Sequence, residues 1–204
     1  MIVWNSTKNR QASFWQKELS FLDKIIYKMR LSRILSGADF SGKIVADTGC
    51  GYNFQFLRAI APKIRKWYAV DISLNRTDTS DNIEIIESNL NDKILLDDNS
   101  VDIITSMAII EHLNCPEQYL KEVHRILKPD GTLIMTVPSV YAKPVLEFLA
   151  YKLWVISKEE ILDHKKYYDR DKLREVLIQA WFSEKNIRHS YFQLGMNNFV
   201  IATK

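Results

Sequence analysis

The sequence has few of the residues that build stapled or fibrous proteins. Among its 204 residues there are only two cysteines, Cys50 and Cys115, and they form no Cys-x-x-Cys zinc spacing. Two thiols cannot make a disulfide framework, so we expect a protein of the reducing cytoplasm. Five prolines and six glycines also exclude a collagen-like or low-complexity chain.

Long hydrophobic runs are missing as well. No stretch reaches the roughly 18–20 apolar residues that a membrane-spanning helix needs, and residues 1–10 lack the apolar core of a secretory signal. Hydrophobic residues nevertheless make up 47% of the chain and charged residues 26%, which suits a buried core with a solvated surface. We therefore expect one domain that spans residues 1–204.

The net charge of +3 is spread unevenly. Residues 1–43 carry eight basic and three acidic side chains, residues 44–140 carry nine and fourteen, and residues 141–204 carry eleven and eight. The basic flanks suit solvated helix faces or attraction to an anionic partner, such as a phosphorylated substrate or a peripheral membrane contact. No dense basic stripe is present, so the pattern disfavours nucleic acid as a partner.

The spacing of apolar residues changes along the chain. From Gln11 to Ser36 it is helical and predicts one or two amphipathic helices that end at Gly37. Short apolar strands then alternate with helices, which predicts a mostly parallel sheet covered on both faces. The expected strands are 43–47, 66–71, 83–87, 101–106 and 132–137, and the expected helices are 54–61 and 116–127.

The last third has a different pattern. A long apolar helix is expected at 140–157, and a shorter one at 171–180 with Asp169 as its cap. Strands at 183–192 and 198–203, joined by a polar turn at 195–198, predict an antiparallel hairpin. We thus expect four parts: an N-terminal helical cap (1–40), a ligand-binding core (41–139), a helical lid (140–168), and a C-terminal helix and hairpin (169–204).

The strongest local signal is the run Asp47-Thr-Gly49-Cys-Gly51-Tyr-Asn53 between a strand and a helix. Gly49 and Gly51 allow positive φ and a close approach of the backbone to a ligand. Asp71 ends the next strand, where a carboxylate can accept hydrogen bonds from both ribose hydroxyls. This combination predicts a ligand that contains adenosine.

Two features favour S-adenosylmethionine (SAM) over a dinucleotide. Phe54 stands where a GxGxxG turn has its third glycine, and its bulk would crowd a pyrophosphate. Asp47 would repel a pyrophosphate but suits the cationic amino group of SAM. An NAD-type oxidoreductase on a related fold is the alternative that the missing glycine disfavours.

The sequence resembles the class I SAM-dependent methyltransferases, in particular the small-molecule group related to ubiquinone and menaquinone biosynthesis methyltransferases. The resemblance covers residues 40–140 and is looser beyond them. It is carried, in order, by Asp47–Gly51, Asp71, Asn89-Leu90, Glu111-His112-Leu113 and Arg125–Gly131. It implies a Rossmann-like sandwich and SAM as cofactor. It also implies a cofactor site made of Asp47, Thr48, Gly49, Cys50, Gly51, Asn53, Asp71, Ile72, Asn89, Leu90 and Met107.

The sequence also departs from this family. Asn53 replaces the usual last glycine, and asparagine tolerates the left-handed conformation that the turn would need. Asn89 replaces an aspartate, but its amide oxygen can still accept a hydrogen bond from adenine. Residues 73–82 are short and polar where the family has a helix, so we expect an irregular loop. These departures leave a non-catalytic SAM-binding protein as a second alternative.

The segment after the fourth strand bears on metal and base chemistry. Some relatives bind a metal through Glu-x-x-Glu-His, but here Ala108 takes the first position before Glu111-His112. We therefore expect no metal site, and a structural role for Glu111 beside the cleft. For a hydroxyl acceptor, His112 and His164 are the candidate general bases, because histidine titrates near neutral pH.

The apolar stretch 140–157 bears on the acceptor. It either packs on the N-terminal helices as core or forms an apolar lid over the acceptor. A lid would suit a lipid-like acceptor, and the basic flanks would also suit a glycan intermediate. We expect an in-line displacement on a small-molecule, lipid-like or glycan acceptor, helped mainly by proximity and orientation.

Overall fold

The computed structural model describes residues 21–75, 82–144 and 166–204. Its centre is one seven-stranded sheet in the order β3-β2-β1-β4-β5-β7-β6. The first five strands pair in parallel, and β7 runs antiparallel to both β5 and β6. This confirms the predicted fold class. The strands are β1 Ile44–Thr48, β2 Lys66–Asp71, β3 Ile83–Glu87, β4 Val101–Met107, β5 Leu127–Pro138, β6 Ile187–Phe192 and β7 Asn197–Thr203.

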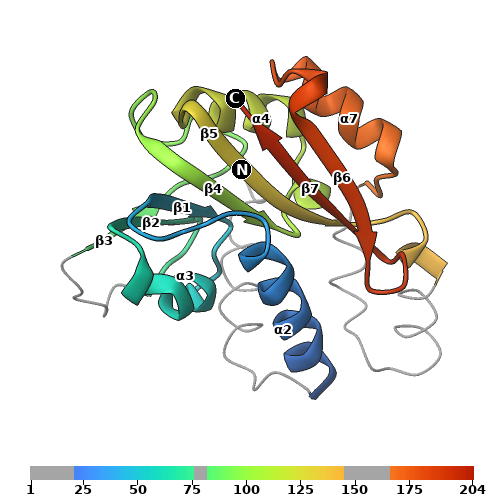
Figure 1. The fold of residues 1–204 in the computed structure, drawn as a ribbon, viewed down its shortest axis with the longest axis horizontal. Coiled ribbons are helices and arrows are strands. Elements are labelled where there is room, and N and C mark those ends of the chain that lie inside the picture. The colour runs from blue at the N-terminus through green and yellow to red at the C-terminus, as the bar shows by residue number, and fades with distance from the viewer. Residues whose placement is uncertain (1–20, 76–81, 145–165) are drawn as a thin grey trace, which may run out of the picture.

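Helices cover both faces of the sheet (Figure 1). Helices α2 (Phe21–Leu35) and α3 (Gln55–Ile60) lie on one face, and α4 (Pro116–Ile126) and α7 (Arg170–Gln179) lie on the other. Each face has its own hydrophobic cluster. Leu57 of α3 and Ile34 of α2 belong to the first cluster, and Leu120 of α4 and Leu177 of α7 belong to the second. Three short 3-10 helices complete the described part: Ala61–Lys63, Ile110–His112 and Glu184–Asn186.

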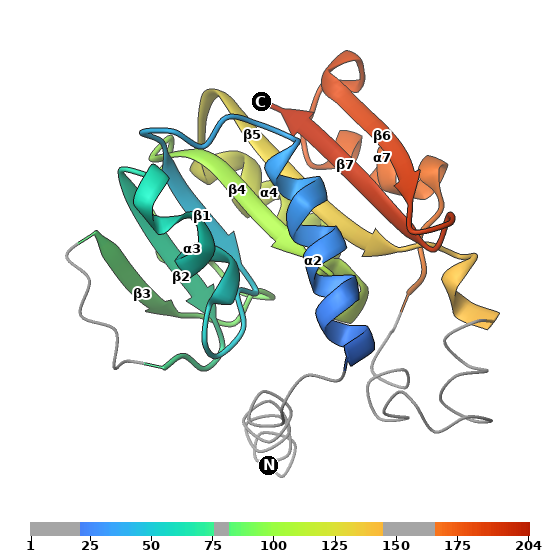
Figure 2. The same cartoon turned by 60° about the horizontal axis from the view of Figure 1, so that its bottom comes forward.

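Helix α2 confirms the predicted N-terminal helix over the residues that the structure describes. The guanidinium of Arg33 lies 4.5 Å from the centre of the Phe199 ring, and its Nη2 donates to Ser190 Oγ at 2.7 Å. These contacts fix α2 against the antiparallel end of the sheet. Figure 2 shows the amino end of α2 extending past the carboxyl ends of β1 and β4.

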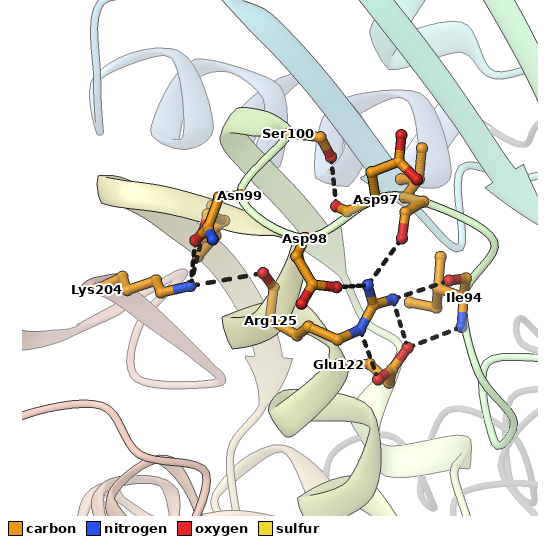
Figure 3. A network of polar contacts seen from close by, with 10 residues as sticks. Ile94, Asp97, Asp98, Asn99, Ser100, Glu122, Arg125 and Lys204 are labelled. Carbon is orange, nitrogen blue, oxygen red and sulfur yellow. Dashed lines mark hydrogen bonds and ion pairs between the residues drawn. The ribbon is translucent and has the colours of Figure 1, made fainter.

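The amino-end edge of the sheet is held by a polar network around Arg125 of α4 (Figure 3). Its guanidinium pairs with Glu122 at 2.8 Å and with Asp98 at 2.5 Å. Lys204 Nζ donates to Asn99 Oδ1 at 2.8 Å and so joins the end of β7 to the same loop. The network explains Arg125 in the motif Arg125–Gly131 as a structural residue, far from the ligand edge.

Several predicted boundaries need correction. Strand β5 begins directly after α4, so Lys128–Gly131 lie within it and not in a loop. The helix predicted at 54–61 ends at Ile60, and a 3-10 helix, Ala61–Lys63, follows it and includes Pro62. The hairpin turn is 193–196, because Asn197 and Asn198 already belong to β7. Asp169 does cap α7, accepting from Lys172 N at 2.9 Å.

Parts of other predictions lie outside the described residues. Most of the long helix predicted at 140–157 does, apart from a helical turn at 142–144. So do residues 1–20 of the N-terminal cap, most of the loop 73–82, and His164. The assignment of residues 140–168 as a lid therefore stays a prediction.

Candidate functional site

The glycine-rich turn lies where the strand order of the sheet reverses. Strand β1 is flanked by β2 and β4, and ligands of open α/β sheets bind at such a switch point, outside the carboxyl ends of the strands. Gly49 and Gly51 both have φ of +73°, which glycine adopts at little cost. Gly49 N donates to Val70 O at 2.7 Å and ties the turn to β2.

Asp71 at the end of β2 is joined to this turn. Its carboxylate accepts from Gly51 N at 2.8 Å and from Ile72 N at 2.7 Å. Burial raises the pKa of Asp71, while the hydrogen bonds from the backbone act in the opposite direction. The acid expected to bind ribose therefore also holds the backbone of the turn.

Asp47 is the most unusual acid at this edge. It is fully buried, and its Oδ1 accepts from Thr105 Oγ1 at 2.6 Å. Its Oδ2 is buried and has no hydrogen-bond partner among the described residues. Burial raises the pKa of Asp47 to about 7, against the lowering effect of Thr105 and with a further increase from the charge of Asp71. A buried oxygen without a donor fits the amino group of SAM, which supplies both charge and N–H donors.

The side chains of Thr48 and Cys50 serve the turn. Thr48 Oγ1 lies 2.6 Å from Tyr119 Oη and donates to Thr105 O at 3.1 Å, so only the backbone of Thr48 is left for a cofactor. Burial raises the pKa of the Cys50 thiol well above its usual value. A protonated thiol of this kind fills space in the turn and is not a nucleophile.

The prediction for Asn53 was wrong in one respect. The left-handed residue is not Asn53 but Phe54, at φ 37° and ψ 49°. Such a conformation is rare for a bulky residue, but here packing outweighs the strain. The Phe54 ring is fully buried, 5.7 Å from the Trp67 ring, with the Arg58 guanidinium 4.8 Å from its centre. Asn53 instead uses its carbonyl to accept from Arg58 Nε at 3.2 Å.

The remaining cofactor candidates lie around this turn on the same edge. Asn89 Oδ1 accepts from the backbone and the side-chain nitrogens of Asn91, both at 3.1 Å. Leu90 is buried in the core. Met107 ends β4 and packs, partly buried, against the cluster that contains Phe54. Their contacts with the cofactor, like that of Ile72, remain proposals.

A second buried acid follows β4. Glu111 is fully buried in the 3-10 helix Ile110–His112, and neither of its carboxylate oxygens has a hydrogen-bond partner among the described residues. Burial raises the pKa of Glu111 to about 8, although its own backbone N–H, which lies near the carboxylate without forming a well-aligned hydrogen bond, and then the charge of Arg30 act to lower it. The motif marked Glu111 only as a structural neighbour of the cleft, whereas His112, the predicted base, is only partly buried.

Helix α2 adds a residue that the sequence did not single out. The pKa of Tyr27 is raised to about 12 by burial and by the charge of Asp47. Tyr27 is therefore within electrostatic reach of the cofactor acid, and Arg30 stands one helical turn later. Hydrophobic periodicity could not find these residues, because both are polar positions of an amphipathic helix.

Metal binding was not expected. Within residues 21–75, 82–144 and 166–204, no group of three or more histidine, cysteine, aspartate or glutamate side chains could hold a metal ion. Metal independence stays a prediction, and a chelator tests it in the assay below.

The space at Gly49 gives a direct test of the turn. A Cβ at Gly49 would overlap with Ile109 Cδ1, at a φ of +73°. We expect Gly49→Ala to displace Ile109 and to weaken binding of S-adenosylhomocysteine (SAH) by more than tenfold. The backbone strain alone costs about 1–2 kcal/mol.

Gly42→Ala is the matched control, because Gly42 has a φ of +68° but a Cβ there would meet nothing within 4 Å. Gly42→Ala should lower the free energy of unfolding in urea, because of the backbone strain, and should leave the affinity for SAH unchanged. Equal loss of SAH affinity in both variants would show that Ile109 and the turn have no special relation to the ligand.

Comparison with known proteins agrees with this geometry. A family described as a methyltransferase domain matches residues 46–135. The chain is 24% identical over 200 residues to the ubiquinone biosynthesis O-methyltransferase of Vibrio parahaemolyticus, covering 88% of this chain and 85% of that protein. The structure is similar to a SAM-dependent methyltransferase from Aquifex aeolicus, with a TM-score of 0.61 and 21% identity, covering 85% and 88% of the two chains. A second, from Mesorhizobium loti, has a TM-score of 0.64 and 15% identity, covering 86% and 96%.

The fold and the turn define an α/β protein with a nucleotide-type ligand at the switch point of its sheet. The methyltransferase domain matched over residues 46–135, together with the relatives, makes the chain similar to SAM-dependent methyltransferases. Within the part of the chain that the structure describes, no helix is both long and apolar enough to cross a membrane.

Proposed function

We propose that this enzyme transfers a methyl group from SAM to a hydroxyl group of a small-molecule acceptor. The observation that carries the proposal is the pair of acids beside the glycine-rich turn: the fully buried Asp47 with its unpartnered oxygen, and the partly buried Asp71 with its link to Gly51. The choice of a hydroxyl acceptor is supported by the Vibrio relatives, which are named ubiquinone biosynthesis O-methyltransferases.

Each part of the turn has its own role in this proposal. Asp71 accepts from the ribose hydroxyls, Asp47 accepts from the amino group, and Asn89 contacts adenine. Gly49 and Gly51 let the backbone approach the cofactor. Bound SAM supplies a methyl group on a positively charged sulfur. The chain's contribution is to hold the acceptor oxygen in line with that methyl group, and such positioning can lower a barrier by about 7–11 kcal/mol.

Calorimetry and a methyl-transfer assay test the proposal. SAM and SAH should bind to the full chain with micromolar affinity, and NAD should not. Labelled methyl should pass from SAM to simple phenols, with catechol and 4-nitrocatechol as probes, and EDTA should not reduce the rate. Binding of NAD in place of SAH would favour an oxidoreductase, and SAH binding without transfer to either phenol would contradict the hydroxyl acceptor.

A further inference from the structure

Glu111 lies directly beyond the carboxyl end of β4. The chain leaves β4 at Met107 and turns at Ala108, which has a φ of 56°. Ala108 N donates to Thr136 O at 2.8 Å and keeps the turn beside β5. The 3-10 helix Ile110–His112 that follows therefore places Glu111 at the ligand edge, in a segment that borders β5 through Ala108 and the glycine-rich turn through Ile109. An acceptor for the methyl group must approach this edge.

Glu111 shares its surroundings with a second unpartnered group. The hydroxyl of Tyr168 is buried and has no hydrogen-bond partner among the described residues, like both carboxylate oxygens of Glu111. Burial, then the charge of Glu111, and last that of Glu117 raise the pKa of Tyr168 to about 12. Two carboxylate oxygens and one hydroxyl group are thus buried without hydrogen-bond partners, which proteins rarely tolerate unless a ligand satisfies them.

The position of Tyr168 is fixed by the backbone. It forms a parallel bridge with Ser139, directly after β5. Its carbonyl accepts from Val140 N at 3.2 Å and from Asn198 Nδ2 at 3.0 Å. Tyr168 is therefore held at the end of β5 in the same way that Glu111 is held at the end of β4.

We propose that the carboxylate of Glu111 binds the hydroxyl group of the acceptor and takes its proton, with the Tyr168 hydroxyl as a second hydrogen-bond partner. This inference rests on the proposed function as an O-methyltransferase. The acceptor O–H bond breaks and its proton passes to Glu111. The acceptor oxygen forms a bond to the methyl carbon, while the bond from that carbon to sulfur breaks and its electron pair stays on sulfur, giving SAH.

The charges around Glu111 set the direction of its pH dependence. Arg30 of α2 favours the carboxylate, Tyr168 is a titratable neighbour, and His112 follows Glu111 in the chain. Glu117 of α4 acts on Tyr168 and does not affect Glu111. With a pKa of about 8, Glu111 is mostly protonated below that pH and cannot accept a proton. The rate should therefore rise with pH up to about 8. A base that titrates near the working pH is the most effective kind.

Glu111→Gln tests the proposal, with Glu117→Gln as the matched control. Glu117 is a partly buried carboxylate that also acts on Tyr168. With catechol as acceptor, Glu111→Gln should lower kcat by about 10²–10⁴-fold and remove the rise of rate with pH. Glu117→Gln should keep both. The more acidic 4-nitrocatechol should restore part of the lost rate, because it needs less help from a base.

A second measurement does not depend on turnover. The visible spectrum of 4-nitrocatechol reports whether it is ionised, and it can be recorded on the complex with SAH. We expect the phenolate in the wild type and in Glu117→Gln, and the neutral phenol in Glu111→Gln at the same pH. Glu111→Asp keeps a carboxylate and should keep the phenolate spectrum at a reduced rate, and thermal melts of each variant report folding.

The outcomes separate this inference from the proposed function. If the wild type methylates the phenols and Glu111→Gln keeps its pH profile and spectrum, the role of Glu111 is wrong and the function stands. If wild-type enzyme binds SAH but methylates neither phenol and shows no phenolate, both fail. Loss of SAH affinity in Glu111→Gln would place Glu111 in the cofactor site and overturn its role as base.

Discussion

Asp47→Asn is expected to make the ligand-free protein more stable at pH 8 and to weaken binding of SAM by about 10- to 100-fold. The wild-type acid is fully buried, and its pKa is raised to about 7 from an ordinary value of 3.8. The folded state therefore holds a proton that the unfolded state has lost between about pH 4 and 7. Stability falls by about 1.4 kcal/mol per pH unit across that range, or up to about 4 kcal/mol in all.

Asparagine removes this penalty because it carries no charge, while its amide oxygen can still accept from Thr105 Oγ1. The gain should be small at pH 4, because this pH is close to the ordinary pKa of 3.8 and the unfolded state has released only part of its proton. The loss of affinity has a separate cause: the amino group of SAM loses a charge-assisted hydrogen bond, which contributes about 1.5–3 kcal/mol. Urea unfolding at pH 4 and pH 8, together with calorimetry at pH 8, measures both effects.

Asp102→Asn provides a control, because the pKa of Asp102 is shifted in the opposite direction to that of Asp47. Burial raises the pKa of Asp102, but hydrogen bonds from Ile44 N at 2.8 Å and from Lys128 Nζ at 2.9 Å outweigh it, so the net shift is downward. Its charge stabilises the fold above about pH 4, and Asp102→Asn should lower stability at pH 8 without changing SAM affinity. If Asp47→Asn behaved like Asp102→Asn, the buried acid would be a structural ion partner and not a cofactor ligand.

The sequence predicted the parts of the fold that local chemistry decides. Strands β2 and β3 have the predicted bounds, because short apolar runs are closed by turn residues and acids at their ends. The positions of Gly49, Gly51 and Asp71 at one sheet edge followed from the strand–turn–helix pattern, since carboxyl ends of parallel strands share an edge. Those signals lie within a few residues of each other, so no tertiary information was needed.

The failures have a tertiary cause. Asparagine is locally better suited than phenylalanine to the left-handed conformation, yet Phe54 adopts it because burial against Trp67 outweighs the strain. Thr48 lies in the cofactor motif, but its side chain faces Tyr119 on the opposite helix layer. The unpartnered oxygens of Glu111 lie where its 3-10 helix meets α2, which carries Arg30, and the segment of Tyr168. These segments come together only in the fold, so no sequence motif could reveal the site.

Asp71→Ala should produce the largest loss of cofactor affinity, about 10²–10⁴-fold for SAH. Two ribose hydroxyls would lose charge-assisted hydrogen bonds of about 1.5–3 kcal/mol each. Alanine also leaves Gly51 N and Ile72 N without the carboxylate that now accepts from them at 2.8 and 2.7 Å. The turn would have to reorganise in the free protein, which adds to the cost of binding.

Asp71→Asn separates these two contributions. It retains one acceptor oxygen for Gly51 N but lacks the charge, so its affinity should fall between those of the wild type and Asp71→Ala. Glu84→Ala is the surface control, because its ion pair with Lys66 at 2.9 Å is exposed and such pairs contribute about 0–1 kcal/mol. Calorimetry with SAH on all four proteins measures the series. An unchanged dissociation constant in Asp71→Ala would remove Asp71 from the cofactor site. Equal losses in Asp71→Ala and Asp71→Asn would assign the effect to charge alone, because the amide would then have gained nothing by holding the turn.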